Sequence, residues 1–240
     1  MSFAPALHAE WIKVRTLRSL VGGLAAILVA TAVFSALFAS SADSGVDDTD
    51  PLFSAFFGVS FGQIAAIAFG TTALSSEFRG GALRLTLSAV PDRGRWFAAK
   101  ATVIALPVLA TGLLTGLVTL LLGKALLGSS GPAWGEGLRG AVGCGLHLTL
   151  MALFAAGLTA VLRSGVATLS ILIPFLLIVS FVIGDLSSGV ADLLPDRAGQ
   201  VALHSSWDGS LGPWSGLAVT AVWAAAALLA GAWSIRRRDA

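Results

Sequence analysis

The sequence predicts an all-α polytopic membrane protein. Of its 240 residues, 56% are hydrophobic and only 12% are charged, whereas about a quarter of the residues of a soluble domain are charged. The apolar residues form long blocks, and six of these reach the roughly 20 residues that a helix needs to cross a bilayer. We therefore expect one domain over residues 1–240, with six spans at about 20–39, 53–74, 98–123, 138–162, 166–184 and 214–233.

An interfacial amphipathic helix is expected at residues 3–19, before the first span. Leu7, Trp11, Val14 and Leu17 or Arg18 recur at helical spacing. His8, Lys13 and Arg15 are expected to point elsewhere. Such a helix serves either as a basic anchor that sets orientation or as a mechanical element. A cleaved signal peptide is the less favoured reading, because the apolar run of about twenty residues exceeds the 7–15 that a signal sequence uses.

The basic residues predict the orientation of the spans. Six spans place both termini on one side, and basic residues gather on the cytoplasmic side of membrane helices. If the termini are cytoplasmic, only Lys124, Arg139 and Arg197 of the 15 lysines and arginines face outward. We therefore predict a multi-pass membrane protein with both ends inside, where anionic lipid headgroups are its neighbours. The absence of tyrosine, the few lysines and the abundant alanine and glycine fit a GC-rich bacterial genome, so we expect a bacterial plasma membrane.

The loop at residues 75–97, between the second and third spans, is the longest and most charged cytoplasmic stretch. Gly80 and Gly81 can end the second span, residues 82–89 can form a short helix, and Pro91 with Gly94 can return the chain to the membrane. A short helix that carries arginines and is held between two spans suits contact with a cytoplasmic partner. A simple solvated loop would look the same if the segment stood alone.

Three segments together resemble one family. They are residues 8–19, the stretch from Ser76-Glu77-Phe78-Arg79-Gly80-Gly81 to Ala89-Val90-Pro91-Asp92-Arg93, and Leu194-Pro195-Asp196-Arg197-Ala198-Gly199-Gln200 in the external loop at 185–213. In this order, on these sides of six spans, they resemble the permease subunits of actinobacterial type 2 ABC exporters (ABC-2 type). Phe78 departs from the tyrosine usual in relatives, and Gly81 from the usual small polar residue.

The resemblance implies an exporter permease without enzymatic activity of its own. Two such bundles, as a homodimer or a heterodimer, would pair with two cytoplasmic ABC ATPase subunits, which would carry ATP and Mg²⁺. The chain has no phosphate-binding loop of the form G-x-x-x-x-G-K-[ST], and we expect neither a cofactor nor nucleic acid as its ligand. The residues that the resemblance implies as contacts to the ATPase are Glu77, Arg79, Arg84, Asp92, Arg93 and Arg95, with Glu10, Lys13 and Arg15 beside them.

Polar residues inside the spans are the other candidates. His147 lies well inside a span, where an ionisable group is a functional candidate by default, although a neutral histidine bonded to a neighbouring helix is the commoner arrangement. Pro107 and Pro174 should kink their helices. The possible pathway-lining residues, which could equally make hydrogen bonds between helices, are Ser60, Gln63, Thr71, Thr72, Ser170 and Ser180.

Other functions find less support in the sequence. An ion-coupled secondary transporter needs acidic residues or ion relays at membrane depth, and no Asp or Glu lies deep in a predicted span. Gly58-Val59-Ser60-Phe61-Gly62 matches a hydrolase motif but lies within a span, where closely spaced glycines serve helix packing, as Gly112 and Gly116 also would. The histidines lack metal-ligand spacing. A non-transporting sensor or assembly protein remains open, and the transported substrate is not encoded in a mostly apolar pathway.

Overall fold

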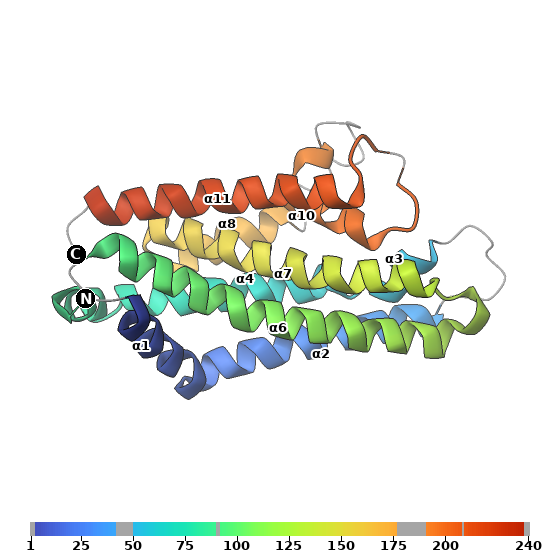
Figure 1. Ribbon diagram of the computed structural model, residues 1–240, viewed down its shortest axis with the longest axis horizontal. Helices are drawn as coiled ribbons and strands as arrows, with labels where there is room; N and C mark the ends of the chain where they lie inside the picture. The colour runs from blue at the N-terminus through green and yellow to red at the C-terminus, as the bar shows by residue number, and fades with distance from the viewer. Residues whose placement is uncertain (1–2, 42–49, 90–91, 177–190, 208, 238–240) are drawn as a thin grey trace.

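The computed structural model describes residues 3–41, 50–89, 92–176, 191–207 and 209–237. Within these ranges almost every residue is helical and none forms a strand. The long helices lie side by side along the long axis of the molecule (Figure 1). The all-α architecture expected from the composition is therefore confirmed.

Five helices of the described residues are long and apolar enough to cross a membrane. They are α2 (Arg18–Ser41), α4 (Val59–Ser75) with its extension η1 (Ser76–Phe78), α6 (Arg93–Leu127), α7 (Trp134–Leu162) and α11 (Pro213–Arg237). These apolar helices are those of a polytopic protein embedded in a membrane.

The prediction of exactly six spans is not confirmed. The described part of the predicted span at 166–184 is the ten-residue helix α8 (Gly165–Pro174) and the two residues after it, and positions 177–184 lie outside the described residues. A helix of that length rises only about 15 Å, half of the roughly 30 Å hydrocarbon core. The described residues therefore contain five complete spans.

Helix α7 lies at the centre of the bundle and packs against α4, α6 and α11. Glycines make these close approaches possible. On α4, a Cβ atom on Gly70 would overlap the carbonyl of Ala152. On α6, a Cβ atom on Gly116 would lie 2.5 Å from the carbonyl oxygen of Ala141. On α7, a Cβ atom on Gly157 would lie 2.5 Å from the backbone of Ala227. The packing role predicted for the glycine motifs is thus confirmed, and Gly62 likewise has no room for a Cβ against Thr31.

Helix α1 (Phe3–Thr16) crosses one end of the bundle and packs mainly on α6 (Figure 1). Ala6 and Val14 are buried while His8 and Arg15 are exposed, so the predicted amphipathic helix is present. It ends three residues earlier than expected, at Thr16, and α2 begins at Arg18. Leu17 alone separates the two helices.

The same end of the bundle, termed the α5 end, carries the predicted short helix. Gly80 and Gly81 have φ angles of 60° and 74°, which L-amino acids with side chains rarely adopt, and they turn the chain after η1. Helix α5 (Ala82–Ala89) follows. Asp92 then caps the first turn of α6 by accepting hydrogen bonds from the backbone amides of Gly94 and Arg95.

The opposite end, termed the α3 end, is closed by short helices. They are α3 (Pro51–Phe56), η4 (Ala191–Leu193), α10 (Pro195–Gln200) and η5 (Val201–Leu203). Helix α10 packs against α11 and α7, and Ala198, Val201 and Ala202 are fully or almost fully buried. The described part of the segment 185–213 therefore consists largely of short helices that fold into the bundle.

Candidate functional site

A buried ionic cluster joins α1, η1 and α6 at the α5 end. It consists of Glu10, Lys13, Glu77 and Lys100. The Nζ atom of Lys100 donates hydrogen bonds of 2.7 Å to Oε2 of Glu10 and to Oε1 of Glu77, and Nζ of Lys13 donates at 2.8 Å to Glu10 and at 2.9 Å to Glu77. Glu10, Glu77 and Lys100 are at most 3% exposed. Three segments far apart in the sequence are therefore held together by charge.

Neutral donors complete the ionic cluster. The indole Nε1 of Trp96 donates to Oε1 of Glu10 at 3.3 Å, and the hydroxyl of Thr86 on α5 donates to Oε2 of Glu77 at 3.4 Å. All four carboxylate oxygens of Glu10 and Glu77 thus accept at least one hydrogen bond. This matters because a buried ion pair compensates its desolvation only when its remaining polar atoms are also bonded.

The charges of the cluster balance, with two carboxylates and two ammonium groups. Lys13 is half-buried, and burial alone would lower its pKa. The hydrogen bonds and charge attraction from Glu10 and Glu77 outweigh that effect and raise the pKa of Lys13 above its usual value. Lys13 therefore stays protonated near neutral pH.

The cluster changes how three of the predicted partner contacts are understood. Glu10, Lys13 and Glu77 contact one another and Lys100 within the chain, and the two carboxylates are buried. They connect α1 and η1 to α6; Glu10 and Glu77 lie off the outer surface, and Lys13 keeps about a third of its side chain exposed. Sequence reasoning missed Lys100, which was counted only as an orientation signal. Its position seven residues inside an apolar helix was the available clue.

Helix α5 presents a mixed polar and apolar face outward. Leu83 is buried, and Leu87 packs against the main core cluster. On the other side Arg84 is exposed and Leu85 is 74% exposed. Beside this face lies a cleft of about 380 Å³ lined by Glu77, Phe78, Gly81, Leu83, Arg84 and Arg163. Leu85 lines a second cleft, of about 300 Å³, together with Ala6, Ala9, Glu10, Lys13, Thr86 and Trp96, so α5 has a cleft on each side.

The other predicted contacts surround α5 and have individual roles. Arg79 and Arg95 are exposed, and Nε of Arg95 lies 3.0 Å from Oδ2 of Asp92. The backbone amide of Arg95, with the charges of Arg95 and Arg236, lowers the pKa of Asp92. Arg93 donates a 2.8 Å hydrogen bond to the carbonyl of Ile235 and so ties the start of α6 to the end of α11. Arg15 is exposed on α1, outside the ionic cluster.

A second buried polar group lies in the middle of the bundle. The Nε2 atom of His147 on α7 lies 3.0 Å from Oε1 of Gln63 on α4, which also accepts a 3.4 Å hydrogen bond from Gln200 of α10. Ser60 donates to Oε1 of Gln200 at 3.4 Å. The interpretation of His147 as a residue bonded to a neighbouring helix is confirmed.

The candidate pathway residues do not gather around one cavity in the described part of the chain. Ser60 and Gln63 belong to the interhelical group around His147, and Thr71 is buried between helices. Thr72 is partly buried, and Ser170 is exposed on α8. Ser180 lies outside the described residues. The interhelical interpretation of Ser60 and Gln63 has direct support from their hydrogen bonds.

The α3 end is held by a third polar group around Asp50. Its carboxylate accepts hydrogen bonds from the backbone amides of Leu52 and Ser205 and lies 3.1 Å from Nδ1 of His204. Burial lowers the pKa of His204, and the charge of Asp50 offsets only part of this effect. His204 is thus neutral at pH 7 and donates Nδ1–H to Asp50. Arg139 donates a 2.7 Å hydrogen bond to the carbonyl of His204 and so stabilises the same group.

Neither a metal centre nor a known relative defines this site. In the described ranges no three His, Cys, Asp or Glu side chains are close enough together to hold a metal ion. The chain matches no protein-family model, and no curated protein matches it. The argument for function therefore rests on the α5 end and its geometry.

Proposed function

We propose that this chain is the membrane-spanning permease subunit of an ATP-driven exporter of the ABC-2 type, located in a bacterial plasma membrane. In this proposal six spans, the fifth at about residues 166–184, cross the membrane with both termini and the α5 end in the cytoplasm. Two permease subunits, identical or different, pair with two ATPase subunits. ATP and Mg²⁺ bind to those partners, and this chain carries no enzymatic activity.

The observation that carries the proposal is the outward face of α5. Its inner side is fixed to the bundle by Leu83, Leu87 and the bond from Thr86 to Glu77, while Arg84 and Leu85 point away from it. The face thus combines a basic side chain with a leucine that is 74% exposed. In our proposal the ATPase covers Leu85 with apolar side chains and lies beside Arg84. The distribution of basic residues in the sequence supports a cytoplasmic location for this partner.

The ionic cluster supplies a route from that partner into the bundle. A displacement of α5 acts on Glu77 through Thr86 and through the chain itself. Glu77 is bonded to Lys100, which belongs to a helix of 35 residues, α6, and Lys100 in turn holds Glu10 of α1. In our proposal, closure of the ATPases on ATP shifts α5, and α1 and α6 move with it. Two-state movement of the spans would then expose the substrate pathway alternately to each side.

Copurification tests the proposal most simply. The tagged chain, expressed together with the ATPase subunits encoded in the same genome and extracted in mild detergent, should retain one ATPase in a 1:1 ratio. Arg84→Glu and Leu85→Asp should each lower the retained ATPase, because they reverse the charge or remove the apolar contact of the α5 face. Arg237→Glu makes the same charge change at an exposed site on α11 and should leave the complex intact.

Two results would count against the proposal. One is a correctly folded chain that retains no ATPase under any of these conditions. The other is transport in vesicles that proceeds without ATP when an ion gradient is imposed, which would favour the ion-coupled alternative. If Arg237→Glu and Arg84→Glu lose the ATPase equally, the α5 face is not the specific contact, because the effect then reflects net charge alone.

A further inference from the structure

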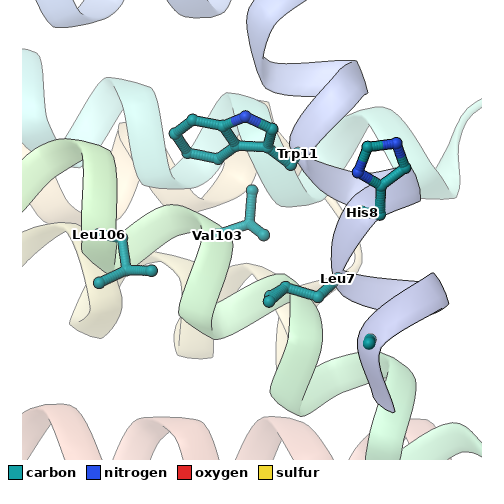
Figure 2. A pocket seen from close by; sticks show the side chains of 6 residues that line it. Leu7, His8, Trp11, Val103 and Leu106 are labelled. Carbon is teal, nitrogen blue, oxygen red and sulfur yellow. The ribbon is translucent and has the colours of Figure 1, made fainter. Parts of the chain in front are cut away.

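A groove between α1 and α6 lies at the α5 end and is not part of the ionic cluster or of the α5 face. It has a volume of about 490 Å³ and is lined by Ala4, Leu7, His8, Trp11, Val103 and Leu106. Figure 2 shows Leu7 and Trp11 extending from α1 towards Val103 and Leu106 of α6. Five of the six lining side chains are apolar, and the volume lies in the range of small-molecule sites.

The groove opens onto the apolar outer surface of the bundle. Leu106 is 54% exposed, and exposed leucines continue along the same helix at Leu114, Leu117 and Leu121. Leu106 lies ten residues beyond Trp96 along α6, or about 15 Å along the helix axis. An occupant that extends from the groove along α6 therefore meets only hydrocarbon-like surface, which suits an acyl chain.

Positive charge follows the groove along the chain. Arg15 follows Trp11 by one helical turn on α1, and Arg18 begins α2. Both side chains are exposed, and no acidic side chain among the described residues forms an ion pair with either of them. Glu10, the one acidic residue of α1, is buried and already bonded to Lys13 and Lys100. The charge at this margin is thus positive and available to an anion.

We propose that the groove binds one anionic phospholipid, with an acyl chain between Trp11 and Leu106 and the phosphate near Arg15 and Arg18. The apolar lining, the opening towards the lipid-facing surface of α6 and the basic margin all match this occupant. A second copy of the chain is a weaker match, because its docking face would have to supply both a long apolar extension and a negative charge. The proposal is independent of ATP-driven transport, since binding requires only the chain and lipid.

Native mass spectrometry of the purified chain tests the proposal. The chain is equilibrated with equal amounts of phosphatidylglycerol and phosphatidylcholine in detergent, and retained lipid is counted. We expect one retained phosphatidylglycerol. Leu106→Trp should fill the groove and abolish this retention, whereas Leu114→Trp, on the same helix and 53% exposed, should not. Arg15→Gln should weaken phosphatidylglycerol binding about fivefold, because one arginine near an anionic surface contributes about 1 kcal/mol.

The outcomes that overturn the proposal are distinct. Equal retention of the two lipids would exclude recognition of the headgroup, and undiminished retention in Leu106→Trp would place the lipid elsewhere. A dimer of the wild-type chain that Leu106→Trp dissociates, without retained lipid in either form, would assign the groove to a second copy. Because Leu106 is largely exposed, Leu106→Trp should fold, and an unchanged melting temperature serves as its control.

Discussion

The Nζ atom of Lys100 lies 2.7 Å from Oε2 of Glu10, although ninety residues separate them in the sequence. The contact joins the helix that precedes the first span to the interior of another span. Lys100 and Glu10 are 4% and 2% exposed at their side chains. A pair so deeply buried is costly to break, because each charge left alone cannot be hydrated.

Replacing Lys100 by methionine should therefore destabilise the protein strongly. Lys100→Met leaves Glu10 and Glu77 buried with Lys13 as their only cationic partner among the described residues. We expect a loss of about 3–5 kcal/mol, measured as a lower midpoint in thermal or denaturant unfolding in detergent. Lys124→Met, at a partly exposed lysine that donates to the carbonyl of Pro132, should cost much less.

A second substitution separates charge from packing in the same cluster. Adding Glu10→Gln to Lys100→Met removes one uncompensated carboxylate and leaves Glu77 paired with Lys13. The double variant should therefore be more stable than Lys100→Met alone. If it is less stable, side-chain packing and not charge balance holds α1 to the bundle.

The glycine contact between α4 and α7 gives a prediction with a matched control. A Cβ at position 70 would overlap the backbone carbonyl of Ala152, and backbone cannot move as a side-chain tip can. Gly70→Ala should therefore cost about 1–3 kcal/mol or more. Gly22→Ala, on the exposed face of α2 with no atom within 4 Å of the new Cβ, should be neutral or slightly stabilising because alanine favours helix. Equal melting temperatures of the two variants would contradict the described packing of α4 on α7.

The pair His147 and Gln63 should behave as an ordinary interhelical hydrogen bond. A double-mutant cycle with His147→Leu and Gln63→Leu should give a coupling energy of about 0.6 kcal/mol, the average for such bonds in membrane proteins. Each single variant leaves one buried polar group without its partner, so the double variant should be less destabilised than the sum of the two. Loss of transport in His147→Leu without loss of stability would instead assign His147 to the pathway.

Acidification should destabilise the α3 end through His204. Burial keeps its folded pKa below the unfolded value of 6.5, so the unfolded chain binds more protons between these two values. The contribution of neutral His204 to the free energy of unfolding is complete above about pH 6.5. It decreases as the pH falls towards the pKa of His204 in the folded protein. The melting temperature should therefore fall between pH 7 and pH 5 more steeply for the wild type than for His204→Gln. Parallel curves would show that His204 does not titrate on unfolding.

The apolar spans could be predicted from the sequence because contact with lipid requires apolar side chains along a whole helix. Runs of about twenty apolar residues need no tertiary information, so α2, α6, α7 and α11 lie close to the predicted ranges. The short helix at 82–89 was also predictable, since glycines before it and a proline after it limit its length. The predicted span at 166–184 is helical over its described residues, with Pro174 inside α8 and Phe175 in α-helical geometry, and positions 177–184 are not among them.

The candidate site was only partly predictable, because it depends on contacts between distant segments. Glu10, Lys13 and Glu77 were identified as a functional group, but nothing in the sequence shows that Lys100 lies between the two carboxylates. Similarly, Gln63 and Gln200 meet at His147 only because α10 folds back between α7 and α11. Hydrophobic periodicity carries no information on such pairings.

The position of the α5 end relative to the membrane tests the central claim most directly. Cys144 is the only cysteine and is buried, so Arg84→Cys and Ser206→Cys in a Cys144→Ser background each offer one exposed thiol. In intact cells a membrane-impermeant maleimide should label position 206 and leave position 84 unlabelled until the cells are opened. Labelling of position 84 from outside intact cells would contradict the account, because no cytoplasmic ATPase could then reach α5.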